Sequence, residues 1–340
     1  MTTTILICSY LEPELVERIE REGDVTVIYR PDLLPTPRYT CDHTGTPREL
    51  SEAQVAQWRD ALARAEVTFD FDWLEVAHMT ENCPKLRWIQ GTSAGIGGLM
   101  ERTGLNAAPL VTTTAGGVHG VPLAEFALTG ALYFTKGLVT LRRWQAAHHW
   151  QRFTTQQLRG RRALVVGLGG MGREIVRLFD AVGVEAWGMG RPGREYRVAG
   201  LSRLVERRDL DSALPEVDVL VLSCPLTKET EGMIGAAQIA LLPAHAVVVN
   251  VSRGQLVDQV ALTEALRTGR LAGACLDVFD VEPLPPEDPL WDLDNVIVSP
   301  HSASTVASEN EALVDLFIDN LGRFRRGEPL KNLYDPVAGY

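Results

Sequence analysis

Three polar side chains follow short apolar runs in the second half of the chain, and their types suit acid–base chemistry. Arg253 follows VVVNVS, Glu282 follows CLDVFDV and His301 follows NVIVSP, and they are 29 and 19 positions apart. If these runs are parallel strands, their carboxyl ends line one edge of a sheet, so the three side chains can converge there. Imidazole titrates near neutral pH, a carboxylate can orient it, and a guanidinium can bind a carboxylate through two parallel hydrogen bonds.

Each of these residues also has a plainer interpretation when it is considered alone. Arg253 beside a glycine is typical of an exposed loop, Glu282 before Pro283 of a turn, and His301 after Pro300 of a structural histidine. The catalytic interpretation therefore depends on the three residues occurring together behind a cofactor motif.

A glycine motif precedes all three. Gly167, Gly169 and Gly172 form GLGGMG between the strand-like RALVV and a helical pattern. The first glycine permits a tight turn, the second lets the backbone approach a pyrophosphate, and the third lets helix and strand pack closely. We therefore predict a dinucleotide site, and the alternative is a glycine turn that binds nothing.

The end of the next strand bears on which dinucleotide binds. An NAD site commonly has an acidic residue about 20 residues after the motif. Gly190 lies 18 residues after Gly172, and Arg191 and Arg194 follow it. Guanidinium groups can pair with a 2′-phosphate, so we predict that NADP(H) is preferred over NAD(H). Glu195 would weaken this effect, and the alternative is that both arginines are solvated loop residues.

The elements that must position these residues alternate between strand-like and helical patterns. The first part starts with strand, helix and strand over TTTILICS, PELVERIEREG and VTVIYR, followed by an irregular proline-rich segment at 31–47. A helix over 51–65, a short helix near 73–79 and the strands EVTFDF and KLRWIQ come next. RALVV, VEAWGM, VDVLVLS, AVVVNV, ACLDV and NVIVS then alternate with helical patterns, which is typical of a parallel sheet covered on both faces.

We accordingly expect an α/β protein with two doubly wound, Rossmann-like parallel-sheet domains and a cleft between them. Residues 1–108 together with 305–340 would form a flavodoxin-like substrate-binding domain. The last expected helix, over about 305–326, belongs to this domain. Residues 109–304 would form the dinucleotide-binding domain.

Composition excludes several other classes of protein. The 44 acidic and 33 basic residues give a net charge of −11, which argues against nucleic acid as a partner. The start, MTTTILICSY, has no basic signal-peptide region and no run of 18 apolar residues follows, so we expect a cytoplasmic protein that does not bind membranes. Five scattered cysteines and the pair His148 and His149 show no metal-ligand spacing, so no metal is expected.

The motifs together resemble one family. GLGGMG, CPLTKETEGMI, NVSRGQLVD, LDVFDVEPLP and SPHSAS are similar to those of the D-isomer-specific 2-hydroxyacid dehydrogenases, which include glyoxylate/hydroxypyruvate reductases. The resemblance implies hydride transfer between NAD(P)H and a small 2-oxoacid. In that scheme His301 donates the proton to the carbonyl oxygen, Glu282 holds His301, and Arg253 binds the substrate carboxylate and carbonyl.

The resemblance also implies binding residues. The loop QGTSAGIGG would bind the substrate carboxylate through Ser93, Ala94, Gly95 and Ile96, although Gly97 stands where relatives often carry aspartate. The plainer interpretation of this loop is a tight connection between the lobes. The implied cofactor-binding residues are Gly167, Gly169, Gly170, Met171, Gly172, Arg191, Arg194, Cys224, Pro225, Thr230, Val251, Ser252, Arg253, Asp277 and His301.

A homodimer is the expected assembly. The segment HGVPLAEFALTGALYFTKGL is nearly all apolar, so its helix should be buried on several faces, one of them at a dimer interface. The stretch from Trp144 to Trp150 resembles a segment that in some relatives reaches the neighbouring subunit's pocket.

Two alternatives to a glyoxylate/hydroxypyruvate-type reductase remain at this point. One is an NAD-dependent enzyme resembling 3-phosphoglycerate dehydrogenase. The other is a dinucleotide-sensing co-repressor of the same fold, in which partner binding matters more than turnover.

Overall fold

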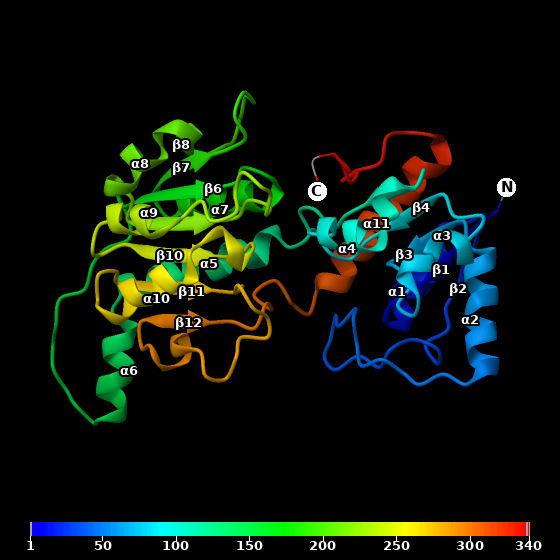
Figure 1. The fold of residues 1–340 in the computed structure, drawn as a ribbon, viewed down its shortest axis with the longest axis horizontal. Coiled ribbons are helices and arrows are strands. Elements are labelled where there is room, and N and C mark those ends of the chain that lie inside the picture. The colour runs from blue at the N-terminus through cyan, green and yellow to red at the C-terminus, as the bar shows by residue number, and fades with distance from the viewer. Residues whose placement is uncertain (1, 338, 340) are drawn as a thin grey trace. The chain divides into compact units, whose positions relative to one another are not determined.

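The computed structural model describes residues 2–337 and 339, and the chain divides into two compact units (Figure 1). One unit combines Met1–His119 with Thr305–Tyr340, and the other is Gly120–Ser304. Each is built on a sheet in which the paired strands are parallel, which confirms the predicted fold class. The expected domain boundary at 108 would have separated β5 (Val111–Thr113) from the first unit, whose β4 (Trp88–Gln90) pairs with it.

The first unit has a five-stranded sheet in the order β2-β1-β3-β4-β5. The remaining strands are β1 (Thr3–Ile7), β2 (Val25–Ile28) and β3 (Val67–Phe69). The helices are α1 (Pro13–Glu20), α2 (Glu52–Arg64), α3 (Met79–Asn82), α4 (Gly97–Thr103) and α11 (Glu309–Arg326), with 3₁₀ helices η1 (Val76–His78) and η2 (Leu105–Ala107).

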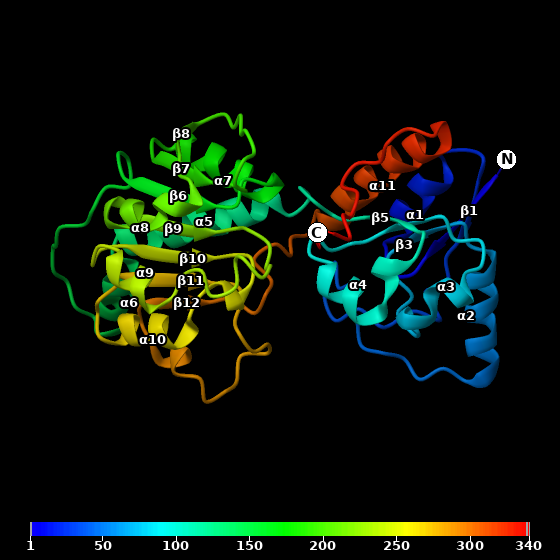
Figure 2. The same cartoon turned by 45° about the horizontal axis from the view of Figure 1, so that its top comes forward.

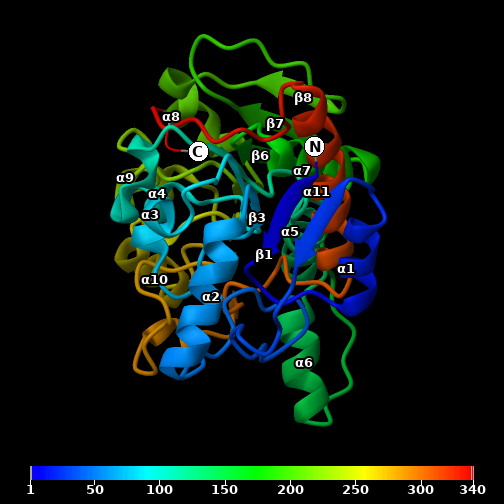
Figure 3. The ribbon, with the colours of Figure 1, turned by 90° about the vertical axis from the view of Figure 1, so that its right-hand side faces the viewer.

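Successive side chains of a strand point to opposite faces of this sheet, so a hydrophobic core forms on each face. Ile5 and Ile7 of β1 face α1 and α11, whereas Leu6 and Cys8 face the side covered by α2. Figure 3 shows β1 between these two helical layers. Phe317 of α11 stacks on Trp88 with ring centroids 5.1 Å apart. The last helix is therefore an integral layer of the first unit.

The second unit has a seven-stranded sheet in the order β12-β11-β10-β9-β6-β7-β8 (Figure 2). Its strands are β6 (Arg162–Val166), β7 (Glu185–Met189), β8 (Leu201–Leu204), β9 (Val219–Leu222), β10 (Val247–Asn250), β11 (Gly273–Leu276) and β12 (Val296–Val298). Its helices are α5 (Gly120–Thr135), α6 (Leu138–Ala146), α7 (Gly170–Ala181), α8 (Leu210–Ala213), α9 (Ala236–Leu241) and α10 (Gln259–Arg267), with η3 (Arg207–Asp209), η4 (Leu214–Glu216), η5 (Gly254–Leu256) and η6 (Pro289–Asp292).

The central strands of this sheet are buried on both faces, which explains their continuous apolar runs. Alternate residues of β9 and β10 contribute to a core with α5 and α7 and to a second core with α8, α9 and α10. Among the described residues, no helix is long and apolar enough to cross a membrane.

Three elements differ from the expectations. β8 was not expected, because its residues 202–204 are exposed and show no apolar pattern. α6 is not among the helices expected from the sequence, and none of its residues is buried. The last helix begins at Glu309 rather than near 305, since the residues before it form turns.

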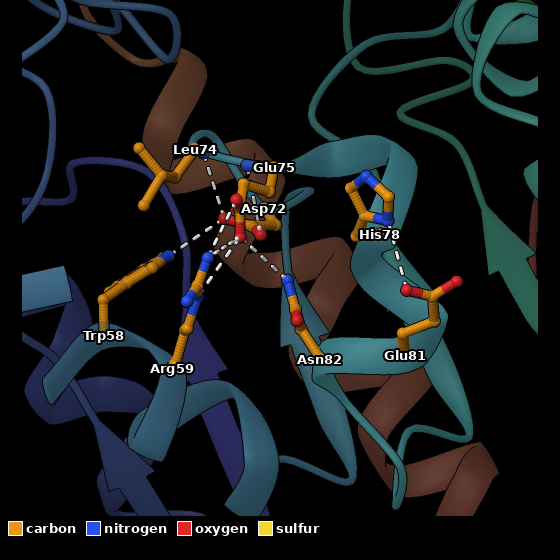
Figure 4. A network of polar contacts seen from close by, with 8 residues as sticks. All are labelled: Trp58, Arg59, Asp72, Leu74, Glu75, His78, Glu81 and Asn82. Atoms are coloured by element: carbon orange, nitrogen blue, oxygen red, sulfur yellow. Dashed lines mark hydrogen bonds and ion pairs between the residues drawn. The ribbon is translucent and has the colours of Figure 1, made fainter. Parts of the chain in front are cut away.

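A buried carboxylate organises the connection after β3. Asp72 is 1% exposed and accepts hydrogen bonds from Trp58 Nε1 at 2.9 Å and from the backbone amides of Leu74 and Glu75 at 3.0 and 3.3 Å (Figure 4). Burial raises the pKa of Asp72, and these hydrogen bonds partly oppose that effect. The carboxylate thus ties α2 to the segment leading into η1.

We expect Asp72→Ala to lower the free energy of unfolding by about 3 kcal/mol, because it leaves buried donors without an acceptor. Urea denaturation measures this change. Asp60→Ala is the control, since Asp60 lies on the same helix as Trp58 but is exposed and pairs with the exposed Arg64. Equal urea midpoints for the two variants would contradict the role of Asp72.

Candidate active site

The glycine turn follows β6 and has the geometry that a dinucleotide requires. Gly167 has φ +104, and a Cβ there would lie 2.6 Å from the backbone nitrogen of Cys224. A Cβ on Gly172 would lie 1.7 Å from the carbonyl oxygen of Gly167. Gly169, the N-cap of α7, has no atom within 4 Å of the Cβ position, so space is open where the helix begins at Gly170. These residues fit a pyrophosphate at a helix N-terminus.

Loops after β9 and β10 lie at the same edge of the sheet. The Ser252 hydroxyl donates to the carbonyl of Cys224, and the Val251 amide donates to the carbonyl of Leu222. The Thr230 hydroxyl donates to the carbonyl of Pro225 at 2.8 Å. These contacts join the predicted cofactor-binding segments to one another.

Cys224 and Met171, two further predicted cofactor residues, differ in their surroundings. Burial raises the pKa of the Cys224 thiol to about 11, so it remains a neutral thiol. Met171 is half-buried in the first turn of α7 and packs against the core beneath that helix.

The loop after β7 is closed by a residue that the sequence analysis did not single out. The Arg191 amide donates to the Tyr196 hydroxyl at 2.8 Å, and the Arg194 guanidinium lies 5.7 Å from the centre of the Tyr196 ring. A Cβ on Gly190 would lie 2.2 Å from that ring. Glycine at 190 therefore also makes room for Tyr196, while both arginines are exposed.

The structure brings Glu282 and His301 into direct contact. Oε2 of Glu282 lies 2.7 Å from Nδ1 of His301, and Oε1 accepts the Phe279 amide at 3.0 Å. The Glu282 hydrogen bond raises the pKa of His301, against the opposing effect of burial. Burial alone would raise the pKa of Glu282, but hydrogen bonds from His301 and from the Phe279 amide lower it overall.

Arg253 completes the cluster of charges. It follows β10, where the Asn250 side chain donates to the Arg253 carbonyl at 2.8 Å and accepts the Ser252 amide at 3.1 Å. Burial lowers the pKa of Arg253 and the Glu282 charge raises it, yet a guanidinium stays protonated. Its positive charge in turn contributes to lowering the pKa values of Glu282 and His301, so the three side chains are close enough to interact.

Asp277 holds the loop that carries His301. Its Oδ1 accepts the Ser299 hydroxyl at 2.6 Å and the backbone amides of Ser302 and Ala303 at 2.9 Å. Asp277 is 2% exposed, and burial raises its pKa against these hydrogen bonds. His301 itself has φ +54, a left-handed conformation that a non-glycine residue adopts only when its surroundings impose it.

Asn250 and Asp277 thus support Arg253 and His301 from the ends of β10 and β11. The sequence analysis missed Asn250 and assigned Asp277 only to the cofactor. The available signal was a polar residue at the end of an otherwise apolar strand, as in VVVN and ACLD.

The predicted substrate loop lies in the first unit, directly before α4. Ser93 and Gly95 are exposed, and the Ser93 carbonyl accepts the Ala115 amide at 3.1 Å. Ile96 is 3% exposed and its side chain belongs to the hydrophobic core, so the side chain itself is not directed at a ligand. Ala94 is half-buried.

The part of the chain that the structure describes contains no group of three or more His, Cys, Asp or Glu side chains that could hold a metal ion. The carboxyl edge of the second sheet carries an imidazole that can transfer a proton and a guanidinium that can stabilise negative charge. A dinucleotide turn beside a paired imidazole and carboxylate is what a dehydrogenase requires.

Comparison with known proteins agrees with this class. The family model described as "D-isomer specific 2-hydroxyacid dehydrogenase, NAD binding domain" matches residues 128–303. A glyoxylate reductase of Korarchaeum cryptofilum is 34% identical over 76% of this chain and 78% of its own length. The chain belongs to the D-isomer-specific 2-hydroxyacid dehydrogenase family and is an NAD(P)-dependent oxidoreductase.

Two further relatives bear on cofactor and substrate. A family member from Xanthobacter autotrophicus, solved with NADPH and MES, is 26% identical, with a TM-score of 0.80 and full coverage of both chains. A D-3-phosphoglycerate dehydrogenase of Archaeoglobus fulgidus is 29% identical over 85% of this chain but only 54% of its own length. The phosphoglycerate alternative is therefore less well supported than a glyoxylate-type reductase.

We expect Glu282→Gln to lower the pKa of His301, because the effects of burial and the Arg253 charge then exceed the opposing effect of the remaining Asp277 charge. An NMR titration of the His301 ring protons measures this shift. Glu264→Gln is the control, since Glu264 pairs with Arg267 on α10. An unchanged His301 titration in Glu282→Gln would contradict the assignment.

Proposed function

We propose that this protein reduces a small 2-oxoacid, with glyoxylate and hydroxypyruvate as the expected substrates, and that it prefers NADPH to NADH. The 2.7 Å contact between Glu282 and Nδ1 of His301 carries the proposal, because it raises the pKa of the imidazole and so favours the protonated form that acts as an acid. The glyoxylate reductase among its relatives supports a small substrate.

His301 acts as the proton donor in reduction. When bound, the nicotinamide supplies the hydride that the carbonyl carbon accepts. Because Nδ1 is engaged by Glu282, Nε2 is the nitrogen that delivers a proton to the carbonyl oxygen. The raised pKa keeps the imidazolium populated toward higher pH than an ordinary histidine would, so the reductive rate declines only as pH rises through that pKa.

Arg253 and the loop 93–96 bind the substrate. The guanidinium orients the carbonyl and stabilises the negative charge that develops on its oxygen. The backbone amides of Ser93, Ala94, Gly95 and Ile96 bind the substrate carboxylate. In this scheme the first unit is the substrate-binding domain and the second unit is the dinucleotide-binding domain.

The preference for NADPH depends on the loop after β7. A carboxylate at position 190 would repel a 2′-phosphate, and Gly190 has none. Arg191 and Arg194 are exposed and follow directly, so they can pair with the phosphate. The relative from Xanthobacter autotrophicus, solved with NADPH, supports this choice.

We further propose a homodimer in the cytoplasm. Val121 and Leu132 of α5 and Trp150 in the loop after α6 are exposed, with Trp150 at 97%, which supports an interface with a second copy. The five cysteines are all free and buried, which supports a reducing compartment.

Wild-type protein should oxidise NADPH in the presence of glyoxylate or hydroxypyruvate, and His301→Ala should lower kcat about 10²-fold or more because the acid is lost. Steady-state assays that follow the absorbance of NADPH measure the activity of the wild type and the kcat of the variant. His245→Ala is the matched control: His245 also contacts a carboxylate, Asp218 at 2.7 Å, but it precedes β10 at the opposite edge of the sheet. A His301→Ala enzyme with normal kcat would refute the proposed role.

The double variant Arg191→Ala, Arg194→Ala should raise KM for NADPH about tenfold and leave KM for NADH nearly unchanged, because each bidentate phosphate contact is lost. Initial rates at varied cofactor concentration provide the measurement. Arg197→Ala, an exposed arginine in the same loop, is the control. A wild-type enzyme that favours NADH would contradict the proposed cofactor preference.

A further inference from the structure

The segment after α11 forms an additional edge on the sheet of the first unit. We name residues 331–337 and 339 the tail segment. The Thr114 amide donates to the Asn332 carbonyl and the Tyr334 amide donates to the Thr112 carbonyl, both at 2.9 Å. Thr113 and Leu333 form the antiparallel bridge between these two bonds. The tail segment is therefore paired with β5. β5 in turn pairs with β4, the strand that precedes the predicted substrate loop.

Buried side chains anchor the start of the tail segment. Asn320 of α11 is fully buried; its Oδ1 accepts the Lys331 amide at 2.8 Å and its Nδ2 donates to the Lys331 carbonyl at 3.2 Å. The Asn332 side chain donates to the Gly116 carbonyl at 2.6 Å. These bonds give the segment a defined register on the sheet.

Two separate observations place the tail segment beside α4. Tyr334 packs on the hydrophobic core cluster that includes Ile96 and Met100, and burial together with the charge of Glu101 raises its pKa. At the start of the same helix, a Cβ on Gly97 would lie 2.1 Å from the carbonyl oxygen of Gly339. The backbone of the tail segment thus occupies the space that a side chain at position 97 would fill.

The neighbouring glycine provides a contrast. A Cβ on Gly98 would meet only the end of the flexible Arg102 side chain, at 3.2 Å. Alanine at 98 can therefore be accommodated by a small movement of Arg102, whereas alanine at 97 requires the tail segment to move. A side chain at position 97 would therefore displace the tail segment, whereas a side chain at position 98 would not.

We propose that the tail segment is a positioning element for the substrate loop: it holds the start of α4, and through it the backbone amides of residues 93–96. The inference rests on the proposed binding of the substrate carboxylate by this loop. A loop that is already held in its binding conformation loses less entropy when the substrate binds, so the tail lowers KM for the oxoacid. Gly97 and Tyr334 are positioning residues in this scheme.

The kinetic test compares matched pairs of variants in the full-length enzyme. Gly97→Ala and Tyr334→Ala should each raise KM for glyoxylate about fivefold, with kcat and KM for NADPH unchanged. Gly98→Ala and Tyr334→Phe should behave as wild type, because the first leaves the tail in place and the second keeps the aromatic ring. Unchanged KM for glyoxylate in both disruptive variants overturns the proposal.

Amide hydrogen exchange provides a readout that does not require turnover. Exchange over residues 91–100 should become faster in Gly97→Ala and Tyr334→Ala and stay unchanged in the two control variants. A parallel fall in kcat, cofactor affinity and melting temperature would overturn the proposal by marking the tail as a general stabiliser. If the wild-type enzyme reduces no oxoacid, the proposed function fails. The positioning role is tested separately by hydrogen exchange, and exchange that is equally slow in all variants overturns it.

Discussion

The hydrogen bond between Glu282 and His301 determines the electrostatics of the candidate active site. Burial and the Arg253 charge both favour a neutral imidazole, and the carboxylate outweighs them. Glu282 can do so because the Phe279 amide and the positive charges of His301 and Arg253 keep it ionised against its own burial. The protonation states of Glu282 and His301 therefore depend on each other and on the fixed positive charge of Arg253.

The parallel sheet of the second unit explains why such a unit forms from distant parts of the chain. Its strands deliver their following loops to one edge, and a buried polar side chain at the end of a strand then shapes each loop. Asn250 does this for Arg253, and Asp277 does it for His301. The strained backbone of His301 is tolerated because Asp277 holds the residues on either side of it, through Ser299 and Ser302.

The fold class and the glycine turn were predictable because each rests on a local pattern, either an apolar run or glycines at fixed spacing. The pairing of Glu282 with His301 was expected from family resemblance, and the structure contains that contact. β8 and Tyr196 were not foreseen, because an exposed edge strand has no apolar signal and a ring that packs over a glycine is a contact in space. The domain boundary was set too early because β5 has only three residues, one of them exposed.

The two-part composition of the first unit has a consequence for biosynthesis. Its core needs Phe317 and Leu313 from α11 against strands β1 and β3, and Phe317 follows Val67 of β3 by 250 residues and Ile7 of β1 by 310. On a ribosome the continuous unit 120–304 is translated before α11, so the folding of this unit does not have to wait for that helix. The amino-terminal strands meanwhile lack α11, which covers one face of their sheet together with α1. Nascent chains of this protein thus expose an unfinished apolar surface until α11 has been made, and we expect chaperones to bind in that interval.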